Sequence, residues 1–162
     1  MHVSLTQHVG VVMLLLLLVV VNLVACSFMA GLIWYVQVVH YPLFKVVGLP
    51  NFSDYHDAHV KRTGWVVILP MLVEIVSAFA IFALTPLGLN KSVAFTGLLL
   101  LGLIWGSTFL AQVPAHEKLS EEFTVEAWQR LVQSNWLRTV GWSLRVPLAG
   151  WMLHAIVTAP IS

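Results

Sequence analysis

The chain has 162 residues, of which 59% are hydrophobic and only 9% are charged. Soluble domains carry about 25% charged residues, so the composition excludes an ordinary water-soluble domain and predicts that lipid surrounds the folded chain. The net charge of +1, without a basic tail, argues against nucleic acid as a partner, and the single cysteine, Cys26, excludes an internal disulfide and cysteine-rich metal sites.

Four apolar segments follow one another, and a helix needs about 20 such residues to cross a bilayer. The second segment contains Pro70, where we expect a kink, and the third ends where it meets Pro114. We predict helices at about residues 9–44, 53–84, 92–113 and 124–158. The expected fold class is all-α: one domain over residues 1–162, an integral membrane, up-down four-helix bundle.

Polar residues gather at four helix ends that such a bundle brings to one side of the membrane. These are the end of the first helix, the start of the second, the end of the third and the start of the fourth, whereas the opposite loop offers little beyond Asn90 and Lys91. Lysine and arginine are also concentrated on the polar side, which predicts that this side is cytoplasmic and that both termini are outside. We therefore expect the protein in the cytoplasmic (inner) membrane of a bacterium.

Four of the seven histidines fall at these helix ends: His40, His56, His59 and His116. Neutral imidazole is the commonest metal ligand, and helical bundles hold metals with histidines and carboxylates on facing helices. We predict that the four histidines bind iron, copper or manganese, or act as acid–base groups; Asp57 and Glu117 are candidate oxygen ligands. The alternatives are a heme with two of these histidines as axial ligands, or interfacial histidines with no role.

A polar stripe also runs along the fourth helix, because Asn135, Arg138, Thr139 and Trp142 fall within about one third of its circumference. An arginine in apolar sequence is costly, so Arg138 is expected to face the bundle interior and to bind an anionic group or a phenolate. The predicted catalytic residues are His56, His116 and Arg138. The predicted substrate-binding residues are Asn135, Arg138, Thr139, Gln112 and Tyr55.

A second polar layer is expected near the middle of the membrane. Glu74 lies 18 residues after His56, which is five turns and about 27 Å along one helix face, so it is too deep to share a metal with His56. Asn22 stands 18 residues before His40 and is therefore expected at the depth of Glu74. Together with Arg145, these residues are predicted to form either a proton relay or a structural buried pair.

Three segments resemble the anthrone-oxygenase-like family of small four-helix membrane proteins. They are GLIWYVQVVHYPLF (Gly31–Phe44), VPAHEKL (Val113–Leu119) and, after a spacer with Trp128, NWLRT (Asn135–Thr139). The resemblance implies a four-helix membrane fold and, for some members, oxidation of anthrones to anthraquinones without a metal. The positions that match the family pattern are Pro114, Asn135, Arg138 and Thr139.

The chain departs from that family pattern in its histidines. His116 stands where the family has asparagine, and His40, His56 and His59 are additions. The function we expect is a membrane-embedded oxidoreductase or oxygenase that acts on a small, lipid-soluble aromatic or quinol-like substrate. The alternative is a non-enzymatic small carrier or an accessory subunit of a larger membrane complex. A homo-oligomer is expected in either case, because chains of this size often associate.

Overall fold

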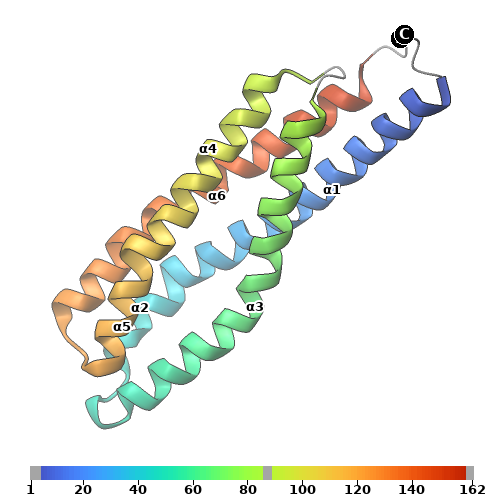
Figure 1. Cartoon of the computed structure of the whole chain (residues 1–162). Helices are drawn as coiled ribbons and strands as arrows, with labels where there is room; N and C mark the ends of the chain where they lie inside the picture. Colours follow the sequence, from blue (N-terminus) through green and yellow to red (C-terminus); the bar gives the residue numbers. More distant parts are fainter. Residues whose placement is uncertain (1–4, 86–88, 160–162) are drawn as a thin grey trace.

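The fold is entirely helical in a computed structural model that describes residues 5–85 and 89–159. Successive helices join end to end into four long rods (Figure 1). The first rod comprises α1 (Leu5–Tyr35), the π-helix η1 (Val36–His40), α2 (Tyr41–Leu43) and the 3-10 helix η2 (Phe44–Val46). The second is α3 (Leu49–Leu84); the third comprises α4 (Lys91–Ser107), the π-helix η3 (Thr108–Gln112) and α5 (Val113–Glu121); the fourth is α6 (Val125–Val157).

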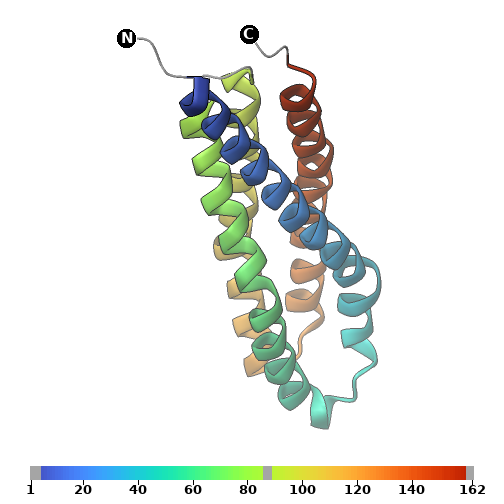
Figure 2. The same ribbon diagram turned by 90° about the vertical axis from the view of Figure 1, so that its right-hand side faces the viewer.

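The four rods lie side by side, and each contacts two neighbours. Helix α1 packs against α3 and α6, and α4 packs against the same two helices. One end of the bundle gathers α2, the start of α3, α5 and the start of α6, as Figures 1 and 2 both show. This is the end at which the sequence places most of its polar residues.

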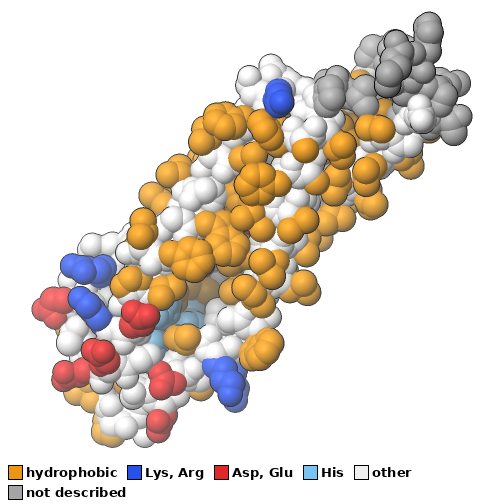
Figure 3. All heavy atoms as spheres, in the orientation of Figure 1, with side chains coloured by type: hydrophobic (Ala, Val, Ile, Leu, Met, Phe, Trp, Pro, Cys, Tyr) orange, Lys and Arg blue, Asp and Glu red, His pale blue; other side chains and the backbone are white. Residues whose placement is uncertain are grey.

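The molecule carries apolar side chains outside and many polar ones inside. Leu110 and Trp65 are 83% and 76% exposed, whereas Glu74 and Asn135 are fully buried. Figure 3 shows hydrophobic side chains covering the middle of the molecule, with charged side chains gathered at the end that holds α5. Three of the described segments, Val9–Val46, Leu49–Leu84 and Lys91–Glu121, are long and apolar enough to cross a membrane. Helix α6 is not among them, since Arg145, Pro147 and His154 interrupt its apolar half.

The prediction that the third helix ends at Val113 is wrong, because the helix continues through Pro114 to Glu121. Proline lacks an N–H and cannot donate the usual hydrogen bond within a helix. The chain accommodates Pro114 with the π-turn η3 directly before it, and it repeats the device at Pro42, which follows η1. Helix α3 likewise begins earlier than predicted, at Leu49, and it bends along its length (Figure 1) with Pro70 in its interior.

The closest approach of α4 and α6 yields a prediction at Gly141. A Cβ atom added there would lie 2.7 Å from Cγ1 of Ile104, which is fully buried. We expect Gly141→Ala to destabilise the protein by about 1–3 kcal/mol, measured by thermal unfolding in detergent, because the core cannot absorb the extra methyl group. Gly150→Ala on the same helix is the matched control: it meets no atom within 4 Å and gains helix propensity, so it leaves stability equal or higher. Equal stability of the two variants would contradict this packing of α4 on α6.

Candidate functional site

Four histidines lie together at the end of the bundle where η1, α3 and α5 meet. His40 is the last residue of η1, His56 and His59 lie on α3, and His116 lies on α5. The ring centroids are 4.4 Å apart for His40 and His59, 5.1 Å for His56 and His116, and 5.7 Å for His59 and His116. The structure thus brings together all four residues that the sequence placed at these helix ends.

The ring nitrogens face one another in two hydrogen-bonded pairs. His40 Nε2 lies 2.7 Å from His59 Nδ1, and His56 Nε2 lies 2.9 Å from His116 Nδ1. A hydrogen bond between two imidazoles needs one donor and one acceptor, so the two facing nitrogens share a single proton. His59 Nδ1 also lies 3.1 Å from the hydroxyl of Thr63.

The pair of His56 and His116 belongs to a longer row of hydrogen bonds. At its outer end, His56 Nδ1 lies 3.1 Å from the hydroxyl of Ser120. At its inner end, His116 Nε2 lies 3.0 Å from the hydroxyl of Tyr41, which has a longer contact of 3.4 Å with Oε1 of Gln112. Tyr41 is buried, with 3% of its surface exposed, so the row leads from the bundle end into the interior.

This row can be completed with neutral imidazoles in two directions. In the first arrangement, Ser120 donates to His56, His56 donates to His116, and His116 donates to the Tyr41 oxygen, leaving the Tyr41 proton for Gln112. In the second, every donor and acceptor is reversed: Tyr41 donates to His116, His116 donates to His56, and His56 donates to Ser120. Each histidine keeps one N–H in both arrangements. The geometry is therefore suited to passing a proton between the buried Tyr41 and the outer Ser120.

A floor of buried amides and one arginine lies beneath Tyr41. Arg138 Nη1 donates to Oε1 of Gln112 and to Oδ1 of Asn135, each at 3.3 Å. Asn135 Nδ2 donates to Oε1 of Gln37 at 2.8 Å. The two glutamines are fixed in turn by the backbone of α6, since Gln37 Nε2 donates to the carbonyl of Val132 and Gln112 Nε2 to that of Leu131, both at 3.2 Å.

Two members of this site were missed in the sequence, Gln37 and Tyr41. Gln37 lies in the π-helix η1, and its counterpart Gln112 lies in η3, so each glutamine occupies a wide helical turn that precedes a proline. Turns of this kind occur frequently at functional sites. The available signal was a lone glutamine in an apolar run a few residues before Pro42 and Pro114.

Arg138 is buried without a negatively charged partner. Only 7% of its surface is exposed, and no carboxylate of the described residues forms an ion pair with it. Its Nε has no hydrogen-bond partner within the same residues, and its guanidinium lies 5.3 Å from the centre of the Trp142 ring. Because an uncompensated buried charge is costly, this position favours an anionic group brought by a ligand.

The remaining predicted substrate-binding residues lie at the margin of this arrangement. The Thr139 hydroxyl is buried but donates to the backbone carbonyl of Asn135 at 3.1 Å, so it is already engaged. Tyr55 is 39% exposed and packs against the rings of His40 and Phe44 at the rim. Thr139 and Tyr55 are therefore corrected from substrate-binding residues to supporting ones.

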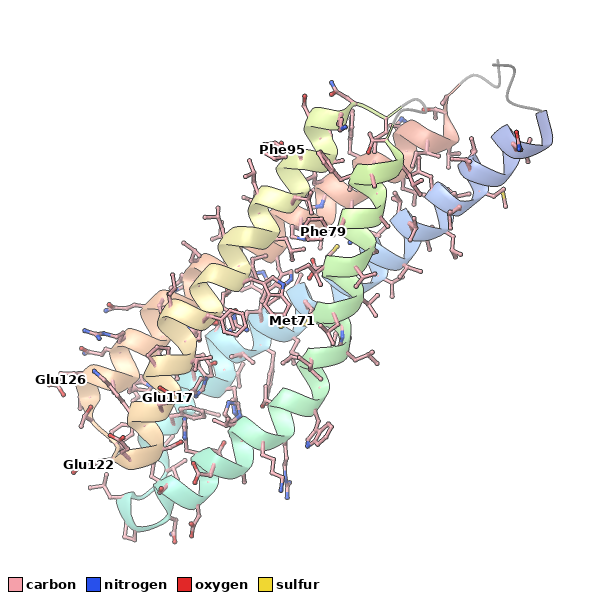
Figure 4. The ribbon with its side chains drawn as sticks, viewed as in Figure 1. Met71, Phe79, Phe95, Glu117, Glu122 and Glu126 are labelled. Atoms are coloured by element: carbon pink, nitrogen blue, oxygen red, sulfur yellow. The ribbon has the colours of Figure 1, made fainter. Side chains whose placement is uncertain are left out.

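The carboxylates at this end lie outside the histidine cluster. Asp57 is 63% exposed and 4.0 Å from His56 Nδ1, and Glu117 is exposed. Figure 4 shows Glu117, Glu122 and Glu126 around the outside of the same end. Among the described residues, no group of three or more histidine, cysteine, aspartate or glutamate side chains is placed to hold a metal ion. Metal binding would require both histidine pairs to open, so the geometry fits hydrogen-bonded pairs and does not fit a metal centre.

The deeper polar layer is built around an ion pair. Glu74 Oε1 accepts from Arg145 Nε at 2.5 Å, and Glu74 Oε2 accepts from Trp142 Nε1 at 2.9 Å. Arg145 also donates to the carbonyl of Gly97 and to Oδ1 of Asn22, and Asn22 Nδ2 donates to the Ser77 hydroxyl at 2.8 Å. All four rods contribute a group to this cluster. The saturation of both charged groups favours the structural interpretation of Glu74, Arg145 and Asn22 over the proton relay.

Removal of one charge from this pair should be far more damaging than removal of a neutral neighbour. We expect Glu74→Ala to destabilise the protein by about 3–5 kcal/mol, because Arg145 then stays buried without a counter-charge. The matched control, Ser77→Ala, loses hydrogen bonds in the same cluster but no charge and costs about 0.5–1.5 kcal/mol. Chemical denaturation in detergent measures both, and equal losses would refute the ion pair; the double variant Glu74→Leu/Arg145→Leu should recover part of the loss.

Comparison of the chain with models of protein families, with curated proteins and with solved structures gives no match. The resemblance to the anthrone-oxygenase-like family therefore stays a prediction from the quoted segments. What this site can do has to be argued from its own geometry.

Proposed function

We propose that this protein is an integral membrane, up-down four-helix bundle that oxidises a small, lipid-soluble phenol or quinol at its histidine-rich end. The observation that carries the proposal is the row of hydrogen bonds from Ser120 through His56, His116 and Tyr41 that ends beside the uncompensated Arg138. The three apolar segments support membrane insertion. The cations at the same end support a cytoplasmic site in a bacterial inner membrane with both termini outside.

Arg138 is the proposed binding group for the substrate oxygen. Its unpartnered Nε and the absence of a carboxylate partner among the described residues favour a phenolate over a neutral phenol. Gln112 and Asn135 hold the guanidinium in place through their amide oxygens. A planar aromatic substrate suits this position because Arg138 already lies over the Trp142 ring.

The histidine row is the proposed route for the substrate proton. With the row in its second arrangement, a phenol proton that reaches the Tyr41 oxygen displaces one proton to His116, then one to His56, and a proton leaves at Ser120. The row is then left in its first arrangement and must reorient before the next cycle. Such positioned acid–base groups typically contribute about 10²–10⁴-fold to a rate.

Dioxygen is the proposed electron acceptor. A quinol loses two electrons and two protons on oxidation to the quinone, and dioxygen that gains both becomes hydrogen peroxide, so the reaction balances without another reagent. Deprotonation raises the electron density of the aromatic ring and so favours electron transfer to dioxygen. The residues of this chain act on the protons and on the phenolate charge.

Substitutions along the row test this proposal. We expect His116→Ala and Arg138→Gln each to lower the oxygen consumption of the protein, reconstituted in nanodiscs with a short-chain benzoquinol, by about 10²-fold or more. His154→Ala is the matched control, since this exposed histidine lies near the far end of α6, outside the cluster. Tyr41→Phe should lower the rate while retaining the fold, because it removes only the hydroxyl.

Two outcomes would contradict the proposal. One is wild-type protein that consumes no oxygen with any quinol or phenol supplied. The other is a protein whose function is abolished by Glu74→Gln but unaffected by the histidine changes, which would support a carrier or an accessory subunit instead.

A metal centre is the competing account of the same histidines. It is favoured by the short separations of the four rings, but it needs both nitrogen pairs to open. The hydrogen-bonded account predicts far less than one iron, copper or manganese per chain by elemental analysis of detergent-purified protein, and no heme absorption. Stoichiometric metal that is lost in His56→Ala and His116→Ala, but not in His154→Ala, would replace the hydrogen-bonded account with the metal one.

A further inference from the structure

A hollow of about 260 Å³ opens on the outside of the bundle between the third rod and the start of α6. It forms because small side chains line both facing surfaces: Ala111, Pro114 and Ala115 on the third rod, and Ala127 on α6. Ala115 and Ala127 are buried, so they form the floor. None of the histidines lines this hollow, which is therefore separate from the site described above.

The rim of the hollow carries two cations from two different rods. Lys118 belongs to α5 and Arg130 to α6, and both side chains are exposed. One carboxylate, Glu126, also lies on the rim, so the charged groups of the rim sum to one net positive charge. Arginine and lysine on opposite sides of a hollow suit a phosphate group, whose oxygens accept hydrogen bonds from both.

The hollow lies at the border between the apolar and the polar surface. Leu110, on its rim, is 83% exposed, and its neighbour Phe109 is 58% exposed. Beyond the hollow, the chain continues into the exposed Glu121 and Glu122 at the end of the bundle. Figure 3 shows the same transition from hydrophobic to charged side chains along the molecule. In a bilayer the hollow would open at the depth of the lipid head groups, with Leu110 and Phe109 beside the acyl chains.

We propose that this hollow binds the phosphodiester head group of an anionic membrane lipid. Lys118 and Arg130 hold the phosphate, and the exposed apolar residues beside them contact the acyl chains. Occupancy would link α5 to α6, because the two cations come from different rods. This inference rests on the membrane insertion stated in the proposed function, but it does not depend on the oxidation chemistry.

The test is retention of lipid by the full-length protein in native mass spectrometry. Detergent-purified protein is mixed with phosphatidylglycerol, with phosphatidylcholine or with inorganic phosphate. We expect one tightly retained phosphatidylglycerol on the wild type and at least a tenfold weaker retention on Lys118→Ala/Arg130→Ala. The matched control, Lys61→Ala/Arg62→Ala, removes two exposed cations from α3 outside the hollow and should retain the lipid.

Three results would overturn the lipid site: equal loss in both double variants, equal retention of phosphatidylcholine, or displacement of the lipid by inorganic phosphate at equal concentration. The first indicates nonspecific surface charge, the second a purely apolar groove, and the third a site for free phosphate. Extraction of membranes at alkaline pH tests the proposed insertion separately. A protein that stays in the membrane but shows no preference for phosphatidylglycerol overturns the lipid site alone.

Discussion

The ion pair of Glu74 and Arg145 is the constraint on which the arrangement of this bundle depends. Polar groups inside an apolar bundle must find partners within the protein, because lipid offers none. Here α1 provides Asn22, α3 provides Glu74, α4 provides the carbonyl of Gly97, and α6 provides Arg145 and Trp142. Since each rod contributes a group, none can slide or rotate without breaking a buried polar contact. The pair therefore fixes the register of the whole bundle.

That register also aligns the histidine-rich end. On α3, Glu74 and His56 are five turns apart on one face, so the depth and phase of one determine those of the other. The layers are joined through Trp142, which donates to Glu74 and carries the Arg138 guanidinium over its ring. The two arginines differ in one respect: Arg145 has its carboxylate and is structural, whereas Arg138 has only amide oxygens among the described residues and is suited to bind an anion. This difference is the physical basis for assigning stability to one layer and chemistry to the other.

Much of this arrangement could be predicted from helical periodicity and composition. The shared face of His56 and Glu74, the common depth of Asn22 and Glu74, and the buried stripe that contains Asn135 and Arg138 all follow from about 100° of rotation per residue. The continuation of the third rod past Pro114 could not be predicted in this way, because a π-turn replaces i→i+4 bonds with i→i+5 bonds and changes the helical phase. The same turns conceal the inward placement of Gln37 and Gln112.

Side-chain orientation set the other limit on what the sequence could reveal. Four histidines at neighbouring helix ends predict proximity, but proximity alone does not distinguish nitrogens that converge on one point from nitrogens that face each other in pairs. The metal site expected from His40, His56, His59 and His116 depended on the first arrangement, and the structure has the second. The family resemblance left the same question open, since its quoted positions include none of these histidines.

The most direct test of this account is solid-state NMR of the protein in lipid bilayers with nitrogen-15-labelled histidine. The account predicts nitrogen–nitrogen correlations between two ring pairs, because the facing nitrogens lie 2.7 Å and 2.9 Å apart. It further predicts that His116→Ala removes one correlation and His59→Ala removes the other. Four uncorrelated rings with the spectra of free, hydrated imidazoles, or ring nitrogens shifted by a bound metal, would contradict it.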